Sequence, residues 1–235
     1  MPEKDTHYLK GIKLIDLAVL IKKRKALVIS DLHLGIESSL RKKGSILPSF
    51  QLEWILERLG GILDIAKPKT IVINGDLKHT FGKTDLQEWG DVKKFLIFCR
   101  SHAETMLIRG NHDNAGIPSA KELRIPLLKE LYIDGYYICH GDQIPTSPAF
   151  NRSHTIIIGH EHPAIRLSSG IRKEAYKAFI FGTYNRKRII IMPSFSEAAY
   201  GTDIRKSHHS PFTKHIKDRR IFIVHKGIHY FGMLS

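Results

Sequence analysis

The chain has 235 residues, and its 37 Lys and Arg against 23 Asp and Glu give a formal charge of +14. This length supports one large core without disulfides, and Cys99 and Cys139 are too few for a disulfide framework. The first residues lack the apolar stretch of a secretory signal, and no apolar run is long enough to span a bilayer. We therefore expect a single domain over residues 1–235, located in the reducing cytoplasm and not in a membrane.

The excess of basic residues has two interpretations. A basic surface attracts polyanions, and nucleic acid is the first candidate among them. The alternative is a solvated surface rich in charge, of the kind found in heat-adapted proteins. Composition alone leaves both open.

Short β-branched runs alternate with longer amphipathic stretches, a pattern typical of an α/β fold. Two helices are predicted from their spacing of apolar residues, over Leu52–Ile65 and Leu86–Ser101. In chain order the predicted strands are Gly11–Val19, Ala26–Ser30, Thr70–Asn74, Thr105–Ile108, Leu131–Ile133, Tyr136–Cys139, Thr155–Ile158, Ala178–Phe181, Arg188–Met192, and a last one that runs from Arg220 to Phe231.

Three connecting segments have a recognisable composition. The basic run Lys22–Lys25 is expected to form a turn between strands, and Asp134-Gly135 suits the tight turn of a hairpin. Residues 201–219 are polar and basic without a clear period, so we expect a mobile basic loop there.

Five of the predicted strands end immediately before residues of metal-ligand type. Carboxyl ends of strands form the crevice in which sites of α/β proteins assemble, so these five ends are expected to converge. The residues that follow the strands are Asp31 and His33, Asp76, Asn111 with His112 and Asp113, His140, and then His160 and His162.

The spacing within each motif agrees with metal binding. Residues i and i+2 of an extended chain face the same side, so Asp31 and His33 can hold one ion, as can His160 and His162. Each motif alone has an ordinary explanation, such as a turn or a surface pair. Five in order, each behind a strand, make coincidence a poor explanation. Carboxylate, amide and imidazole ligands together suit Mn, Fe, Zn or Mg.

These motifs, taken in order from Asp31 to about Gly201, resemble the calcineurin-like metallophosphoesterase superfamily. The resemblance implies a four-layer αββα sandwich with two divalent metal ions, of which manganese is the preferred candidate and Fe, Zn, Ni, Co or Mg are alternatives. It implies that one metal is bound by Asp31, His33, Asp76 and His162. It implies that the second is bound by Asp76, Asn111, His140 and His160. His112 matches the catalytic histidine of the superfamily, and Asp113 is placed to orient its ring.

Two further motifs are similar to particular branches of this superfamily. The block from Gly75 to His79 resembles that of SbcD-type repair nucleases, in which the histidine also acts at the phosphate, so His79 is a catalytic candidate. The motif Met192–Phe195 and the run from Ser30 to Gly35 are similar to DNA-ligase-associated phosphoesterases. The likeness is to an archaeal SbcD-related phosphoesterase of that kind.

The hypothesis is a hydrolase that cleaves phosphodiester bonds of nucleic acid with a hydroxide activated by the dinuclear centre. One alternative is a phosphodiesterase for small or cyclic nucleotides. Another is a metal-binding scaffold without catalysis. The sequence leaves the oligomeric state open, a homodimer included.

Overall fold

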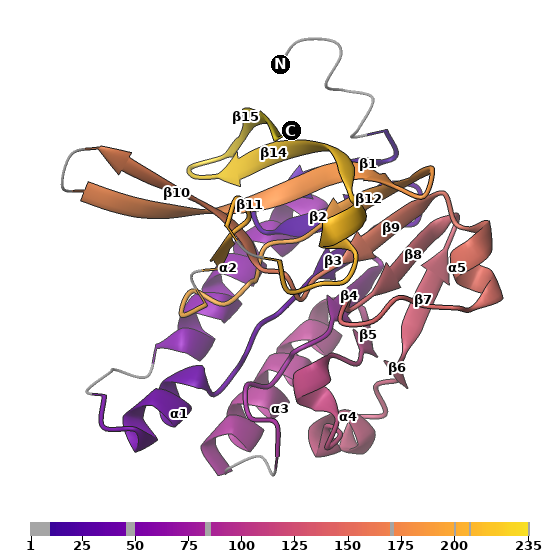
Figure 1. The fold of residues 1–235 in the computed structure, drawn as a ribbon. Helices are drawn as coiled ribbons and strands as arrows, with labels where there is room; N and C mark the ends of the chain where they lie inside the picture. The colour runs from indigo at the N-terminus through magenta and orange to yellow at the C-terminus, as the bar shows by residue number, and fades with distance from the viewer. Residues whose placement is uncertain are drawn as a thin grey trace.

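The computed structural model describes residues 10–45, 50–82, 86–169, 172–199, 201–206 and 208–234. Within these residues the strands form two sheets that pack face to face, with helices against the outer face of the first sheet (Figure 1). The expected α/β sandwich in a single domain is confirmed. Among the described residues, no helix has the length and apolar character needed to cross a membrane.

The first sheet comes from the N-terminal half of the chain. The described helices of this half are α1 (Ile36–Lys42), α2 (Gln51–Ala66), α3 (Leu86–His102) and α4 (Pro118–Glu122). The strands lie in the order β1 (Ile12–Ile15), β2 (Ala18–Ile21), β3 (Ala26–Ile29), β4 (Thr70–Asn74), β5 (Glu104–Ile108) and β6 (Leu127–Leu128). β1, β2 and β3 are antiparallel, whereas β3 to β6 are parallel because helices connect them.

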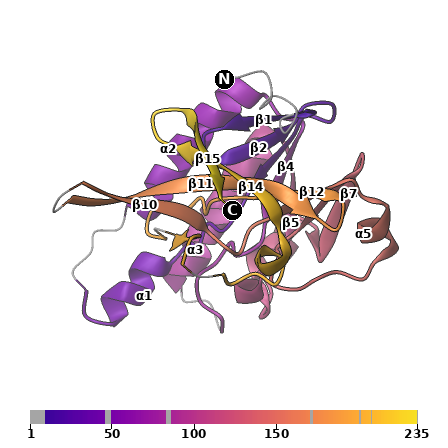
Figure 2. The same cartoon turned by 45° about the horizontal axis from the view of Figure 1, so that its top comes forward.

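The second sheet comes from the C-terminal half. Its order is β13-β10-β11-β12-β9-β8-β7, and β14 pairs with both β11 and β15. The bounds are β7 (Glu130–Ile133), β8 (Tyr136–Cys139), β9 (Thr155–Ile158), β10 (Pro163–Ser169), β11 (Arg172–Tyr184), β12 (Lys187–Ile191), β13 (Thr202–Asp203), β14 (Lys217–Val224) and β15 (Ile228–Leu234). The β10–β11 hairpin extends outward from the body of the protein (Figure 2).

Three apolar clusters fill the spaces between the layers. The first joins α2 and α3 to the first sheet, and the middle one lies between the sheets, where Val28 and Val72 meet Ile157 and Phe179. The third covers the outer face of the second sheet with α5 (Pro148–Arg152) and the segment around the 3₁₀ turn Thr213–His215. The fourth layer is therefore thinner than the first.

The strands that precede the site are the best predicted elements. β4, β8 and β9 have the predicted bounds, and the turn Asp134-Gly135 has positive φ at both residues, as the hairpin prediction requires. Their residues are almost entirely buried because a sheet layer or helices cover both faces. Such strands appear in the sequence as continuous apolar runs.

Two strand predictions are wrong, and one seven-residue strand was not predicted. The predicted strand Gly11–Val19 is the β1–β2 hairpin, which turns at Asp16, where φ is 51°. The predicted strand Arg220–Phe231 is the β14–β15 hairpin, which turns around Gly227. β10 was not predicted, because its outer residues Arg166, Leu167 and Ser168 are exposed and lack an apolar run.

The segment 201–219 contains more regular structure than its composition indicated. Gly201 precedes β13, and a 3₁₀ turn over Thr213–His215 leads into β14. Residue 207 of this segment lies outside the described residues.

Candidate metal centre

The expected strand ends meet at one edge of the sandwich. β3, β4 and β5 of the first sheet bring Asp31, Asp76 and Asn111 to this edge, and β8 and β9 of the second sheet bring His140 and His160. Backbone hydrogen bonds connect the loops, since the amide of Asp31 donates to the carbonyl of Gly75 at 3.2 Å and that of His33 to Asp76 at 2.9 Å. The two sheets thus contribute to one cluster.

The backbone of the site is unusual. Asp31, His33, Asp76, His160 and His162 all have φ between 47° and 62°. Such left-handed conformations of non-glycine residues cost of order 1–3 kcal/mol each and gather at functional sites. The chain turns sharply after each strand, so the side chain of each of these residues points into the cluster.

Two glycines allow the closest approaches. A Cβ atom at Gly110 would lie 2.1 Å from Oδ1 of Asp76, and one at Gly159 would lie 1.9 Å from Oγ of Ser30 and 2.4 Å from Oδ2 of Asp31. No other residue fits at these positions without displacing the carboxylates.

The first ligand group contains Asp31, His33, Asp76 and His162, and its ligand atoms all lie within 4.8 Å of one another. Nε2 of His162 is 3.1 Å from Oδ1 of Asp31 and 3.3 Å from Nε2 of His33. Nε2 of His33 is 3.8 Å from Oδ2 of Asp76. This is the set that the resemblance implied for the first metal.

The second group contains Asp76, His140 and His160, again within 4.8 Å. Nε2 of His140 lies 3.4 Å from Oδ2 of Asp76, 3.2 Å from Nδ1 of His160 and 2.9 Å from Oδ1 of Asn111. Asn111 therefore adjoins the same cluster with its amide oxygen. Asp76 belongs to both groups, as expected of a shared ligand.

The protonation states of these residues reflect their crowding. Burial raises the pKa of Asp31, but His162, His140 and His33 outweigh burial and hold the pKa well below its usual range. Burial, followed by the charge of His162, lowers the pKa of His33 to about 3. At His140 burial lowers the pKa, yet Asp76 and Asp31 raise it to about 9. The carboxylates thus attract positive charge into the cluster.

The residues fit a pair of divalent cations. Imidazole nitrogens of His33 and His162 face one another at 3.3 Å, as do those of His140 and His160 at 3.2 Å, beside buried carboxylates. Nitrogen atoms so close together repel one another when protonated, whereas a cation between them binds their lone pairs. The mixture of oxygen and nitrogen donors, with both cysteines outside both groups, is that of a catalytic site.

His112 lies at the side of these two groups and forms a third with His33 and His79, whose ring nitrogens also lie within 4.8 Å of one another. Its Nε2 is 3.8 Å from Oδ2 of Asp76, and its backbone amide donates to Oδ1 of Asp76 at 2.9 Å. The ring is 4.8 Å from that of His33 and 5.6 Å from that of His79, measured between centroids. His112 Nδ1 bonds the backbone carbonyl of His79.

Asp113 has different contacts from those expected. The structure gives its carboxylate bonds from the amides of Gly110 at 3.0 Å and of Leu77 and Lys78 at 3.4 Å. Burial raises its pKa to about 6. Asp113 therefore joins the loops after β4 and β5, and the His112 ring bonds the carbonyl of His79.

Several supporting residues carried no signal in the sequence analysis. Gln51 of α2 donates to the carbonyls of Leu32 and His33 at 3.1 and 3.0 Å, and Glu88 of α3 accepts from the amides of His79 and Thr80 at 2.9 and 2.8 Å. These contacts join segments distant in sequence, so no local pattern predicts them.

Glu161 is the exception, because it stands between two expected ligands. It is fully buried and accepts from the amides of His209 at 3.0 Å and Ser210 at 2.7 Å and from Oγ1 of Thr213 at 3.2 Å. A carboxylate between two histidines of the same strand end was a usable signal.

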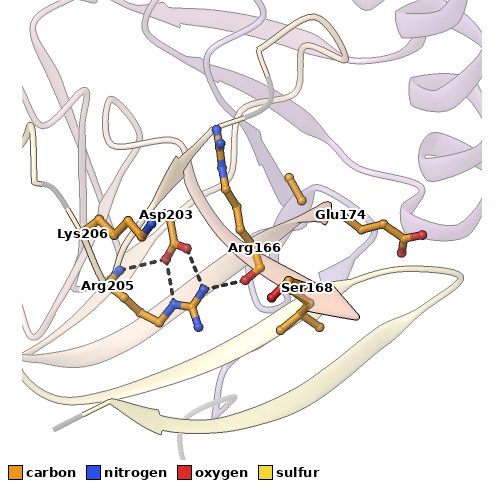
Figure 3. A pocket seen from close by; sticks show the side chains of 8 residues that line it. Arg166, Ser168, Glu174, Asp203, Arg205 and Lys206 are labelled. Carbon is orange, nitrogen blue, oxygen red and sulfur yellow. Dashed lines mark hydrogen bonds and ion pairs between the residues drawn. The ribbon is translucent and has the colours of Figure 1, made fainter. Parts of the chain in front are cut away.

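Two hollows differ in their relation to the centre. One, of about 450 Å³, is lined by His140 and Gly110 of the centre together with Arg109, Lys129 and Asn114. The other, of about 320 Å³, lies along β10, where Arg205 binds both oxygens of Asp203 at 2.9 and 2.7 Å (Figure 3). The first continues the candidate site, whereas the second contains none of the ligand residues.

A family model described as calcineurin-like phosphoesterase matches residues 24–233. A comparison with curated proteins finds no match. Among solved structures, the nuclease MPE of Pseudomonas putida is 22% identical, with 94% of each chain covered and a TM-score of 0.65. Yfce, a phosphoesterase from E. coli, is 13% identical, with 89% of this chain and 98% of that chain covered and a TM-score of 0.42. The first of these structures shares the fold described above.

Proposed function

The chain belongs to the calcineurin-like phosphoesterase family, and we propose that it is a nuclease-like phosphodiesterase that cleaves single-stranded nucleic acid. The observation that carries the proposal is the cleft of about 450 Å³ that continues from the centre, in which Arg109 and Lys129 lie beside His140, together with the acidic Glu130 and Asp142. A polymer substrate leaves several phosphates outside the reacting position, and cations along a cleft bind them.

In this proposal, Asp31, His33, Asp76 and His162 hold one divalent cation, and Asp76, Asn111, His140 and His160 hold the other. Two ions bound there, manganese by preference, would supply Lewis acidity at the phosphate and would lower the pKa of bound water. Binding of both cations by Asp76 is supported by its Oδ2 atom, which lies 3.8 Å from Nε2 of His33 and 3.4 Å from Nε2 of His140.

His112 is the proposed general acid. The carbonyl of His79 accepts a hydrogen bond from Nδ1–H, which stays protonated whether the ring is neutral or charged, so Nε2 is the atom that gains and loses a proton. Nε2 also faces the shared carboxylate. In this mechanism Nε2 of His112 donates a proton to the leaving oxygen, while the ring of His79 stabilises charge on the phosphoryl group. Asp113 acts indirectly, by holding the loops that carry both histidines.

The branch of the family is part of the proposal. The motifs Gly75–His79 and Met192–Phe195 support an SbcD-related, DNA-ligase-associated type, and a nuclease with the same fold agrees with it. Phe195 and Ser196 donate backbone hydrogen bonds to the carbonyls of Ser30 and Asp31, at 2.8 and 3.3 Å. The second motif thus supports the strand end that bears the first ligands.

The salt dependence of cleavage tests the polymer substrate. For single strands the logarithm of affinity should fall with the logarithm of salt concentration by about 0.7 per phosphate contacted. The double variant Arg109→Gln/Lys129→Gln should reduce this slope by about 0.7 for each contact removed. The control is Lys22→Gln/Lys25→Gln, which removes exposed charges from the β2–β3 turn, at the amino end of β3 and thus at the opposite edge of the sheet.

A cyclic nucleotide assayed in the same salt series separates the two kinds of substrate. It offers one phosphate, so its cleavage should respond weakly to salt. A flat profile for the oligonucleotide, together with a higher kcat/KM for the cyclic nucleotide, would instead establish a phosphodiesterase for small nucleotides.

A further inference from the structure

Phe81 is a large apolar residue at the side of the metal centre, and 62% of it is exposed. Its ring stacks on that of His112, with centroids 3.7 Å apart and an interplanar angle of 29°. Because His112 covers one face of the Phe81 ring, the exposed area belongs to the other face and the edges. The face of Phe81 that points away from His112 is therefore open to a ligand, close to the histidine that contacts Asp76.

The loop that presents Phe81 is held on both sides. Lys78 donates to the carbonyls of Thr80 and Gly82, and Glu88 accepts from the amides of His79 and Thr80. Lys78 and Glu88 are themselves almost completely buried. A ring fixed in this way loses little conformational entropy when a ligand stacks on it.

The surroundings of Phe81 suit a charged, aromatic ligand. A β-bridge joins Lys78 to Leu34, two residues before α1, and the charge of Lys43, which follows α1, acts on His79 of the same loop. The proposed phosphate-binding residues Arg109 and Lys129 line the cleft beside His140. Each nucleotide joins a planar base to a phosphate through one sugar, and every base offers a face that can stack on an aromatic ring.

We propose that Phe81 is a stacking platform for the nucleobase on the leaving-group side of the cleaved phosphate. The inference rests on the proposed function and adds a base subsite to it. His112 protonates the leaving oxygen, and the nucleoside that carries this oxygen continues toward the ring that covers His112. Stacking of this kind tolerates any base, so the subsite selects single strands without selecting sequence.

The test compares two backbones with the same phosphates. One is a short single-stranded DNA oligonucleotide, and the other carries tetrahydrofuran abasic residues in place of all its nucleosides. Manganese-loaded wild-type protein, Phe81→Ala and Phe81→Trp are assayed on both. The control variant is Phe231→Ala, which removes another exposed phenylalanine, on β15 at the end of the second sheet.

Phe81→Ala should lower kcat/KM on the base-bearing strand by roughly 5- to 150-fold, the worth of one base–aromatic stack, and should leave the abasic strand unchanged. Phe81→Trp should keep or raise the preference for bases, and Phe231→Ala should match the wild type. Equal losses on both strands would show that Phe81 merely supports His112 and would overturn the subsite. No loss on either strand would overturn it too.

Failure of the proposed function is recognised separately, from the wild type alone. Wild-type protein that hydrolyses a chromogenic phosphodiester but neither strand would refute the nuclease assignment, and the base subsite with it. Wild-type protein that cleaves the oligonucleotide while Phe81→Ala behaves identically would refute only the subsite.

Discussion

At the scale of single residues, the proposed function gives Asp76 and His112 separable tasks. Asp76 belongs to both ligand groups, whereas His112 touches the carboxylate from outside with its ring and amide. Removing the first should remove the metals, and removing the second should leave them in place.

His112→Ala is therefore expected to retain its metal content and to lose roughly 10²-fold or more in kcat, the usual worth of general acid catalysis. A substrate with a good leaving group needs less protonation and should lose less. Asp76→Ala should lose both metal and activity. Metal analysis and turnover on two diesters with good and poor leaving groups check these expectations.

Two results would contradict this division. Equal losses for good and poor leaving groups would give His112 an electrostatic role without proton transfer. Two retained metals and near-normal turnover in Asp76→Ala would exclude Asp76 as the shared ligand.

The residues of the candidate centre were predictable for a physical reason. Asp31, Asp76 and His140 each follow a buried apolar strand within two residues, and strand ends converge in a parallel sheet. Gln51 and Glu88 were not predictable, because each lies on a helix and acts on a loop distant in sequence. Phe81 also lacked a local signal, since its contact with His112 exists only in the folded chain.

At the scale of secondary-structure elements, burial on both faces decided which strands the sequence predicted. β4 and β9 are covered on both sides and read as unbroken apolar runs. β10 has an exposed outer part, and the β1–β2 and β14–β15 turns contain no strong turn dipeptide. The sequence analysis therefore joined the two strands of each of these hairpins into one predicted strand.

The loop between β13 and β14 depends on Glu161, which accepts three hydrogen bonds from it. Glu161→Gln should reduce the free energy of unfolding by about 1.5–3 kcal/mol, the range for hydrogen bonds to charged groups. Trypsin should then cleave faster after the exposed Arg205 and Lys206. Denaturant unfolding and limited proteolysis measure both effects.

Glu57→Gln is the matched control, because Glu57 is exposed on α2. Its unfolding and proteolysis should equal those of the wild type. If Glu161→Gln also behaves like the wild type, the loop is held by its apolar contacts at Phe212 and Ile216 instead.

At the scale of the whole molecule, the ligand groups connect the two sheets. The first group joins Asp31 and His33 to His162, and the second joins Asp76 to His140 and His160, so each spans the space between the sheets. A cation bound by either group should resist separation of the sheets, beyond what the apolar cluster between them provides.

Removal of metal with a chelator should therefore lower Tm, and added manganese should restore it. Free metal at a hundred times its Kd stabilises the folded state by about 2.7 kcal/mol. Hydrogen exchange should slow together at β3–β4 and β8–β9, and Asp76→Ala should abolish both responses. A Tm insensitive to chelator and metal, or protection confined to one sheet, would contradict the connection.

The division of the sheets along the chain also bears on synthesis. Residues 12–128 supply the first sheet and residues 130–234 the second, and domains fold from the N-terminus as they leave the ribosome. The early half carries the carboxylates and one ligand histidine, whereas His140, His160 and His162 emerge later. Neither ligand group is complete in the nascent chain until most of the polypeptide has been made. In the proposed function, metal therefore finds a complete ligand group only late in synthesis, and a product truncated before His160 lacks ligands of both groups.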